Sequence, residues 1–232
     1  MTLRSAGRLR PRPSGALAAA LHESASRHEH LCPRQVLGAR IALLAGRALG
    51  LRLPRRDRRL IAIVETDGCF VDGLTIAAGC SVGGRTLRLE DYGKVAASFL
   101  DTETARAVRI TPHPQAREVA IRFAPAAENR WQAQLIGYQH MPDDLLLSAN
   151  PVRLVASLAE LVGEARARAR CDGCGEEVID RREVVRGGQT LCRACAFGAY
   201  YLAASSFPAQ GRRQPVVECV ATRRRALLVN RG

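Results

Sequence analysis

The chain has 232 residues, of which 47% are hydrophobic and 25% are charged. This length and composition allow one sizeable core with a small addition, and they exclude a chain that is disordered throughout. No stretch of about 18 consecutive apolar residues occurs, so the sequence predicts neither a membrane-spanning helix nor a membrane partner.

The formal net charge is +13, while aromatic residues make up only 4% of the chain. Arginine clusters bind nucleic acids by releasing counterions from phosphates. The excess charge is nevertheless scattered over several segments, and few aromatic side chains are available to stack on bases. A nucleic-acid partner is therefore an alternative that the composition does not favour.

The N-terminal segment is basic and leads into a short apolar run, Ala16 to Leu21. That run is shorter than the roughly 7–15 apolar residues of a signal peptide. We therefore expect a disordered basic arm over residues 1–13 and a cytoplasmic protein. Ser14 is a suitable N-cap for a helix over residues 15 to about 25.

The next segments alternate between helix and strand signals. Pro33 suits the first position of a helix, and Gly50 suits its end. LIAIVET, residues 60–66, predicts a central strand, and a helix over 71–78 should follow between Cys69 and Cys80.

Beyond the glycine-rich turn GCSVGG, three short strands are expected to form a meander, at residues 86–89, 95–100 and 106–111. Residues 114–139 should be helical with an interruption at Pro125. An edge strand over 145–154 would tolerate Pro151. These elements predict an α+β core over residues 14–156, followed by a charged helical linker, 157–170.

The strongest motif begins at Cys171 and has the spacing C-x2-C-x17-C-x2-C. Four thiolates give Zn²⁺ a closed tetrahedral shell, which is typical of structural sites. We expect Cys171, Cys174, Cys192 and Cys195 to bind zinc. The knuckle after Cys174, a hairpin around Gly187-Gly188 and a helix over 194–204 together predict a treble-clef zinc finger over residues 171–205. A basic tail, 206–232, follows.

A second group of ligand-type residues lies in RHEHLCPRQVLG, where His28, His30 and Cys32 fall within five positions. Cys32 and Cys69 each precede a predicted helix, where free N–H groups lower a thiol pKa. With Cys69 as a further ligand, such a group would leave an open coordination position. The alternatives are a loop His-x-His, a Cys32 that only caps a helix, and a buried Cys80 that acts as a small hydrophobic residue.

Three segments, HEHLCPRQVLGARIALL, AIVETDGCFVDGLTIAAGCSVGG and EDYGKVAASF, precede the four-cysteine module. With that module they resemble the FmdE family, named for the E subunit of formylmethanofuran dehydrogenase, from about residue 28 to 200. The resemblance implies a thioredoxin-like core of mixed β-sheet flanked by helices, a C-terminal treble clef, and a homodimer. It also implies a cleft lined by histidine and cysteine that takes a second zinc or other transition metal ion.

Carried onto this chain, the cleft candidates are His28, His30, Cys32, Cys69, Cys80, Asp91 and Lys94. Lys94 is the only lysine among 35 basic residues. Glu29 and Arg34 stand where the family usually has glycine, so the ligand of this cleft is expected to differ.

We expect an accessory or regulatory protein of molybdenum- or tungsten-dependent one-carbon metabolism, with an oxidoreductase as partner protein. One alternative is a thiol- or metal-dependent enzyme, in which Cys69 or Cys32 is the nucleophile and Lys94 an acid–base or electrostatic group. Another is a nucleic-acid-binding regulator that uses the finger and the basic tail. The sequence leaves open whether the protein is an enzyme.

Overall fold

The structure is a computed structural model that describes residues 15–28, 30–158, 161 and 167–202. The chain divides into two compact units, residues 1–163 and 164–232, which are considered separately. The predicted arm 1–13, half of the predicted linker and the tail 206–232 lie outside the described residues. No helix in the described ranges is long and apolar enough to cross a membrane.

The first unit is built on a five-stranded mixed sheet with the order β2-β1-β3-β4-β5. Its strands are β1 (Leu60–Val64), β2 (Leu87–Leu89), β3 (Ala97–Asp101), β4 (Ala107–Pro112) and β5 (Leu147–Val152). β1 and β2 pair in parallel, and all other pairs are antiparallel. The α+β class with a mixed sheet flanked by helices is therefore confirmed.

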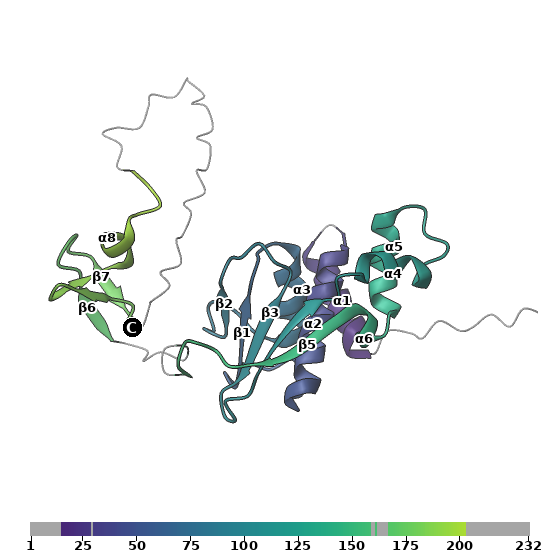
Figure 1. Cartoon of the computed structure of the whole chain (residues 1–232), viewed down its shortest axis with the longest axis horizontal. Coiled ribbons are helices and arrows are strands. Elements are labelled where there is room, and N and C mark those ends of the chain that lie inside the picture. The colour runs from purple at the N-terminus through teal and green to yellow at the C-terminus, as the bar shows by residue number, and fades with distance from the viewer. Residues whose placement is uncertain (1–14, 29, 159–160, 162–166, 203–232) are drawn as a thin grey trace, which may run out of the picture. The chain divides into compact units, whose positions relative to one another are not determined.

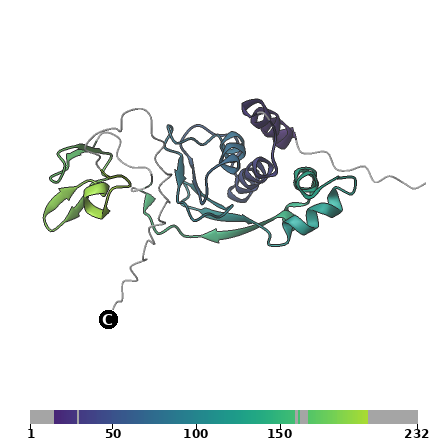
Figure 2. The same cartoon turned by 90° about the horizontal axis from the view of Figure 1, so that it is seen from above.

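Helices cover one face of this sheet (Figures 1 and 2). They are α1 (Gly15–Arg27), α2 (Pro33–Leu49) and α3 (Cys69–Ala78), and α3 connects β1 to β2. A group of shorter helices precedes β5, comprising α4 (Ala116–Ala120), the 3-10 turn η1 (Ile121–Phe123), α5 (Arg130–His140) and α6 (Asp143–Leu146).

Side chains of the central strands point alternately to the two faces of the sheet, so an apolar cluster forms on each face. Leu60, Ala62 and Val64 belong to the large apolar cluster shared with the helices. Ile61 belongs to a smaller cluster on the opposite face, together with Leu100. This follows from the period of two in a strand, and it explains why β1 reads as a continuous apolar run.

The predicted meander is wrong in one respect, because β2 does not pair with β3. Strand β1 lies between them, with Ala62 opposite Leu87 on one side and opposite Phe99 on the other. A helix of ten residues between β1 and β2 provides the crossover that parallel pairing requires. As a result, the loops after β1 and after β2 leave the sheet at the same edge.

Arg40 lies in the middle of α2 and is buried despite its charge. Its guanidinium donates to the carbonyl oxygens of Tyr138 and Met141, both at 2.6 Å. It also pairs with Asp143 at 2.7 Å. The charge therefore satisfies the last carbonyl groups of α5 rather than facing solvent.

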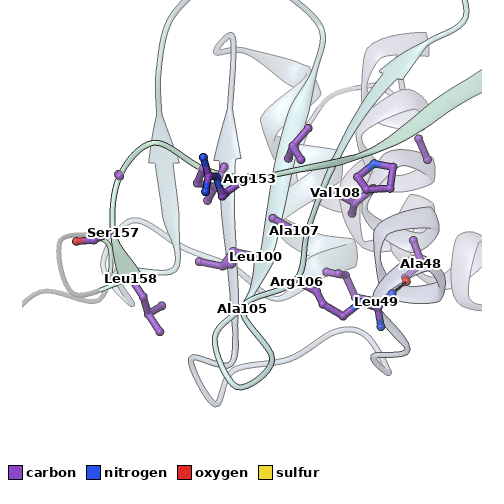
Figure 3. Close-up of a pocket in the computed structure, with 15 residues that line it drawn as sticks. Ala48, Leu49, Leu100, Ala105, Arg106, Ala107, Val108, Arg153, Ser157 and Leu158 are labelled. Carbon is purple, nitrogen blue, oxygen red and sulfur yellow. Dashed lines mark hydrogen bonds between the residues drawn. The ribbon is translucent and has the colours of Figure 1, made fainter.

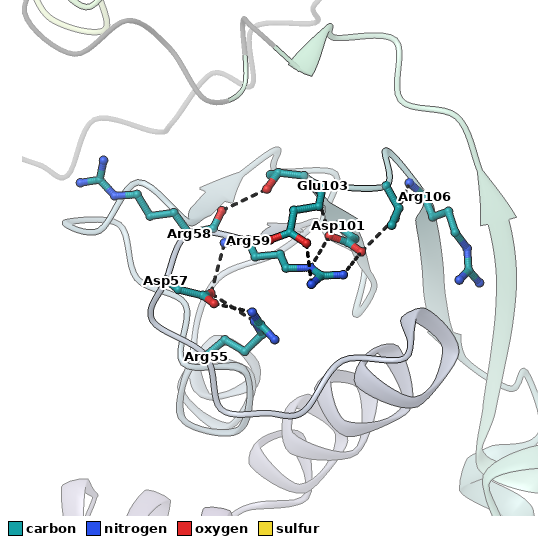
Figure 4. Close-up of polar contacts among 9 residues, drawn as sticks. Arg55, Asp57, Arg58, Arg59, Asp101, Glu103 and Arg106 are labelled. Carbon is teal, nitrogen blue, oxygen red and sulfur yellow. Dashed lines mark hydrogen bonds and ion pairs between the residues drawn. The ribbon is translucent and has the colours of Figure 1, made fainter.

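A second buried charge lies where β3 ends (Figure 4). Asp101 is fully buried and accepts from Arg59 Nε at 2.8 Å and Nη2 at 2.9 Å. Thr104 Oγ1 and the backbone N–H of Glu103 also donate to this carboxylate. These contacts hold the pKa of Asp101 well below its usual range, chiefly through Arg59.

The described part of the second unit, residues 167–202, has two short hairpins and one short helix. β6 (Arg168–Arg170) pairs with β7 (Glu177–Ile179), and β8 (Val184–Arg186) pairs with β9 (Gln189–Leu191). Helix α8 (Arg193–Phe197) follows β9. This order of knuckle, hairpin and helix follows the order predicted for a treble clef.

Two boundaries in this unit differ from prediction. Residues 168–170 form a strand instead of the end of a helical linker. The predicted helix 194–204 is replaced by α8, which has only five residues because Gly198 ends it with a φ of 97°.

Candidate functional site

Four cysteine sulfurs converge in the second unit. Cys171 and Cys174 lie in the turn between β6 and β7, and Cys192 and Cys195 lie at the start of α8. All four Sγ atoms are within 4.8 Å of one another, and those of Cys174 and Cys192 are 3.9 Å apart. Tetrahedral zinc with Zn–S bonds of about 2.3 Å separates its sulfurs by about 3.8 Å. The cluster therefore fits a four-coordinate metal ion.

Backbone N–H groups point at these sulfurs. Cys192 N–H donates to Cys171 Sγ at 3.1 Å, and Cys195 N–H donates to Cys192 Sγ at 3.4 Å. Such donors favour the thiolate, and those around Cys171 lower its pKa to about 6. The neighbouring sulfurs raise the pKa of Cys195 instead. Four thiolates in this space therefore require a bound cation.

Glycines make the knuckle possible. Gly175 has a φ of 75°, which side chains rarely adopt. A Cβ atom added at Gly173 would lie 3.1 Å from Cys195 Sγ. The glycines in CDGCG are thus required by the turn and by the close approach of the second cysteine pair.

Two further thiols meet in the first unit. Cys32 is the N-cap of α2, and its backbone N–H donates to Gln35 Oε1 at 2.6 Å. Cys69 is the first residue of α3, and its thiol lies near enough to that of Cys32 for Cys32 to raise its pKa. The N-termini of two helices therefore present a pair of cysteines, named here the thiol pair (Cys32 and Cys69).

Direct backbone contact between α2 and α3 brings the thiol pair together. A Cβ atom added at Gly38 would lie 2.0 Å from the carbonyl oxygen of Phe70. One added at Gly73 would lie 2.0 Å from the carbonyl oxygen of Gln35. No side chain larger than hydrogen fits at either position, so both glycines are needed for the helices to approach.

Within the thiol pair, the Cys69 thiol is protonated at neutral pH. Burial raises the pKa of Cys69, the neighbouring Cys32 thiol raises it further, and the charge of Asp72 adds to the effect. A protonated thiol is a weak nucleophile. Metal binding would displace the proton, since thiolates are the ligands.

The remaining cleft candidates lie at different distances from this pair. His28 Nε2 is 2.9 Å from Asp72 Oδ2, and Asp72 lies one helical turn after Cys69. His30 is exposed. Cys80 follows the opposite end of α3, where its buried thiol faces the carbonyl oxygen of Leu60 at 3.6 Å.

The loop that carries Asp91 and Lys94 runs beside the end of β1, since Lys94 N–H donates to the carbonyl oxygen of Glu65 at 3.1 Å. Lys94 is exposed, with its Nζ 5.9 Å from the ring centroid of Tyr92. Asp91 Oδ1 accepts from Gly93 N–H within the same loop. Among the described residues, only the four C-terminal cysteines bring three or more ligand atoms within 4.8 Å.

Asp72 and the ion pair between Glu65 and Arg109 were not expected. Arg109 Nε and Nη2 contact the two oxygens of buried Glu65 at 2.6 and 2.7 Å. The signal for Asp72 was its place three residues after Cys69, on the same helical face. The pairing of Glu65 with Arg109 depends on strands far apart in the sequence and left no local signal.

An apolar cavity of about 550 Å³ lies between the end of α2, β4 and β5 (Figure 3). Leu49, Leu100 and Val108 line it, with Arg106 and Arg153 as its charged members. No cysteine, histidine or carboxylate lines this cavity, so it offers no soft or acidic ligand for a metal ion and does not include the thiol pair.

Comparison with known proteins gives three findings. Residues 27–148 match the FmdE family, described as "Molybdenum formylmethanofuran dehydrogenase operon". A probable S-adenosyl-L-methionine-binding protein from Archaeoglobus fulgidus is 26% identical over 209 residues, covering 82% of this chain and 55% of that protein. The chain thus spans about half the length of this curated relative.

The third finding is structural. An FmdE-like protein from Syntrophus aciditrophicus, described by its likeness to the E subunit of tungsten formylmethanofuran dehydrogenase, matches with a TM-score of 0.52 and 21% identity. The match covers 80% of this chain and 95% of that one, and at this identity it concerns the fold alone. Since the family match covers more than half of the 232 residues, the chain belongs to the FmdE family.

Proposed function

We propose that this protein is a zinc-binding accessory or regulatory protein of molybdenum- or tungsten-dependent one-carbon metabolism of the formylmethanofuran dehydrogenase type. Membership of a family described by that operon supports the metabolic setting. In this proposal the four-cysteine module holds a structural zinc ion. The thiol pair binds a second transition metal ion, with His28 as a further ligand.

The observation that carries the proposal is the placement of Cys32 and Cys69 at the N-termini of two helices that pack backbone to backbone. Soft thiolates and imidazole suit zinc and other late transition metals. Asp72 engages Nε2 of His28, which leaves Nδ1 as the nitrogen that could bind a metal while the carboxylate orients the ring. The raised pKa of Cys69 leaves it a weak nucleophile at neutral pH, and metal binding at this thiol would release its proton.

The second unit supports docking of a protein partner, which we take to be an oxidoreductase. It exposes several large apolar side chains, namely Ile179, Val185, Phe197, Tyr200 and Tyr201. Exposed apolar groups of this kind mark interaction surfaces. A homodimer stays a prediction.

The enzymatic alternative has less support from the geometry. It needs Lys94 beside Cys69, whereas the side chain of Lys94 is exposed and its described contact is with Tyr92. S-adenosyl-L-methionine, named for the Archaeoglobus relative, is best included as a test ligand. Nucleic-acid binding stays an alternative that predicts affinity falling steeply with salt.

Metal content per chain tests the proposal, on protein purified without air or added metal. We expect two ions in the unaltered chain, one in a Cys32→Ser/Cys69→Ser variant and one in a Cys174→Ser/Cys195→Ser variant. Cys80→Ala, at the other end of α3, is the matched control and should keep both ions. A single ion that the first variant retains would contradict metal binding by the thiol pair.

A further inference from the structure

A polar cavity of about 650 Å³ lies in the first unit. Its walls are the end of α1, the segment 54–58, the end of α3 and the glycine-rich turn 79–86 before β2. Cys69 begins α3, whereas the cavity residues of that helix begin at Thr75, about 9 Å further along it. The cavity contains none of the proposed metal ligands, although Arg27 in its wall directly precedes His28.

Arginines in and around this cavity fall into two groups. Three are neutralised by carboxylates: Arg27 by Glu23, Arg55 by Asp57, and Arg59 by Asp101 and Glu103. Arg56 and Arg58 line the cavity, and neither side chain has a carboxylate or other polar partner among the described residues. Figure 4 shows the side chain of Arg58 extending away from the Arg59–Asp101 pair.

The backbone holds Arg58 in an unfavourable conformation. Its φ is 64°, in the left-handed region that non-glycine residues rarely adopt, and its carbonyl oxygen accepts from Thr102 Oγ1 at 3.5 Å. Strain of this kind persists where the surroundings fix it, often at binding sites. Two unneutralised guanidiniums in one concavity repel each other and attract an anion.

The glycine-rich turn supplies a hydroxyl group to the cavity. Ser81 Oγ accepts from Gly84 N–H at 3.0 Å, and its own proton has no acceptor in the described part of the chain. A Cβ atom added at Gly84 would lie 2.8 Å from this oxygen, so the turn requires glycine there. The hydroxyl is therefore available to donate to a ligand.

We propose that this cavity binds the phosphate group of a small phosphorylated molecule through Arg56, Arg58 and Ser81. Guanidinium groups match phosphate geometry in a bidentate manner. The volume falls in the range of about 300–1,000 Å³ typical of small-molecule sites. No aromatic residue lines the cavity, which disfavours stacked bases and therefore a nucleic-acid strand. Glu23 also faces the cavity, but Arg27 neutralises it.

Calorimetric titration of inorganic pyrophosphate into the full chain at about 50 mM salt tests this assignment. We expect saturable binding that weakens at least about tenfold in an Arg56→Gln/Arg58→Gln variant. Arg122→Gln removes the same charge from an exposed position on η1 and should change the dissociation constant less than about twofold.

Arg58→Gly separates binding from folding. Glycine adopts a φ of 64° without strain, so this variant should unfold at an equal or higher denaturant concentration while its affinity for pyrophosphate falls. Absence of pyrophosphate binding to the unaltered chain would overturn the proposal, as would unchanged affinity in the double arginine variant. A single-stranded oligonucleotide that binds more tightly and displaces pyrophosphate would assign the arginines to a nucleic acid instead.

Discussion

Arg59 and Asp101 form a two-pronged ion pair at the end of β3, with N···O distances of 2.8 and 2.9 Å. Asp101 is fully buried, whereas about a quarter of the Arg59 side chain (26%) is exposed. The pair ties the segment before β1 to the turn after β3. It therefore fixes the segment 54–58, which forms one wall of the polar cavity.

Asp101→Asn should lower the free energy of unfolding by about 2–3 kcal/mol, because it leaves Arg59 without its buried partner. Asp57→Asn removes an exposed carboxylate from the same segment and should have little effect. Urea unfolding at pH 7 measures both. The pKa of Asp101 is lowered on folding, so its contribution is present above pH of about 4 and is lost as pH falls below that value. Equal effects of the two substitutions would contradict this account.

Gly38→Ala should destabilise the first unit by about 1–3 kcal/mol, because the new Cβ forces α2 away from the backbone of Phe70. It should also separate the thiol pair, so that mild oxidation no longer joins Cys32 to Cys69. Gly15→Ala is the matched control, since no atom lies within 4 Å of a Cβ there. Denaturant midpoints and free-thiol titration report the two effects. A Gly38→Ala protein as stable as the control would show that the helices can repack.

Cys80 should make stability fall at alkaline pH. Burial raises its pKa from 9.0 to about 11, so the folded state holds the proton more tightly than the unfolded state. The contribution is fully present below pH 9.0 and is lost as pH rises towards about 11. Its size is at most about 2–3 kcal/mol. Cys80→Ala should flatten the decline between these pH values, and an unchanged slope would exclude this thiol as its source.

Metal removal should unfold the second unit and leave the first intact. The hairpins of the second unit are only three residues per strand, so the cluster of sulfurs is its main source of stability. Trp131 is the only tryptophan in the sequence and lies on α5 of the first unit. Its fluorescence should show the same unfolding midpoint with and without a chelator, while amide exchange over residues 167–197 becomes fast. A shifted Trp131 midpoint would mean that the two units stabilise each other.

Local signals predicted many of the elements. Pro33 and Gly50 bound α2 as expected, the helical signal breaks near Pro125, and Pro151 lies on the edge strand β5. Each of these depends on backbone preferences of one residue or on a short apolar period. The C-x2-C spacing likewise depends on a local turn, and the sulfurs it predicts do converge.

Pairing over long distances was not predictable in this way. The sequence of strand β2 has the same pattern as the sequences of the strands that follow it. Only the packing of α3 on the sheet determines that β2 pairs with β1 in parallel. The burial of Arg40 had no local signal, because the carbonyl groups it satisfies come from the end of α5, nearly 100 residues later. Gly198 was a local signal for the end of α8. The apolar residues after it nevertheless favoured the prediction of a longer helix. Occupancy of the thiol pair, a thioredoxin-like classification and the dimer stay predictions.

The parallel crossover from β1 to β2 also decides which sequence changes the protein can absorb. Lengthening the turn 81–85 would leave the pairing of Leu87 with Ala62 in place, so the loop with Lys94 would stay beside Glu65. A single residue inserted within β2 would turn Leu87 from the core to the opposite face. An insertion in the turn should therefore preserve the fold while displacing Ser81 and Gly84, whereas an insertion in the strand, only a few residues later, should disrupt the core itself.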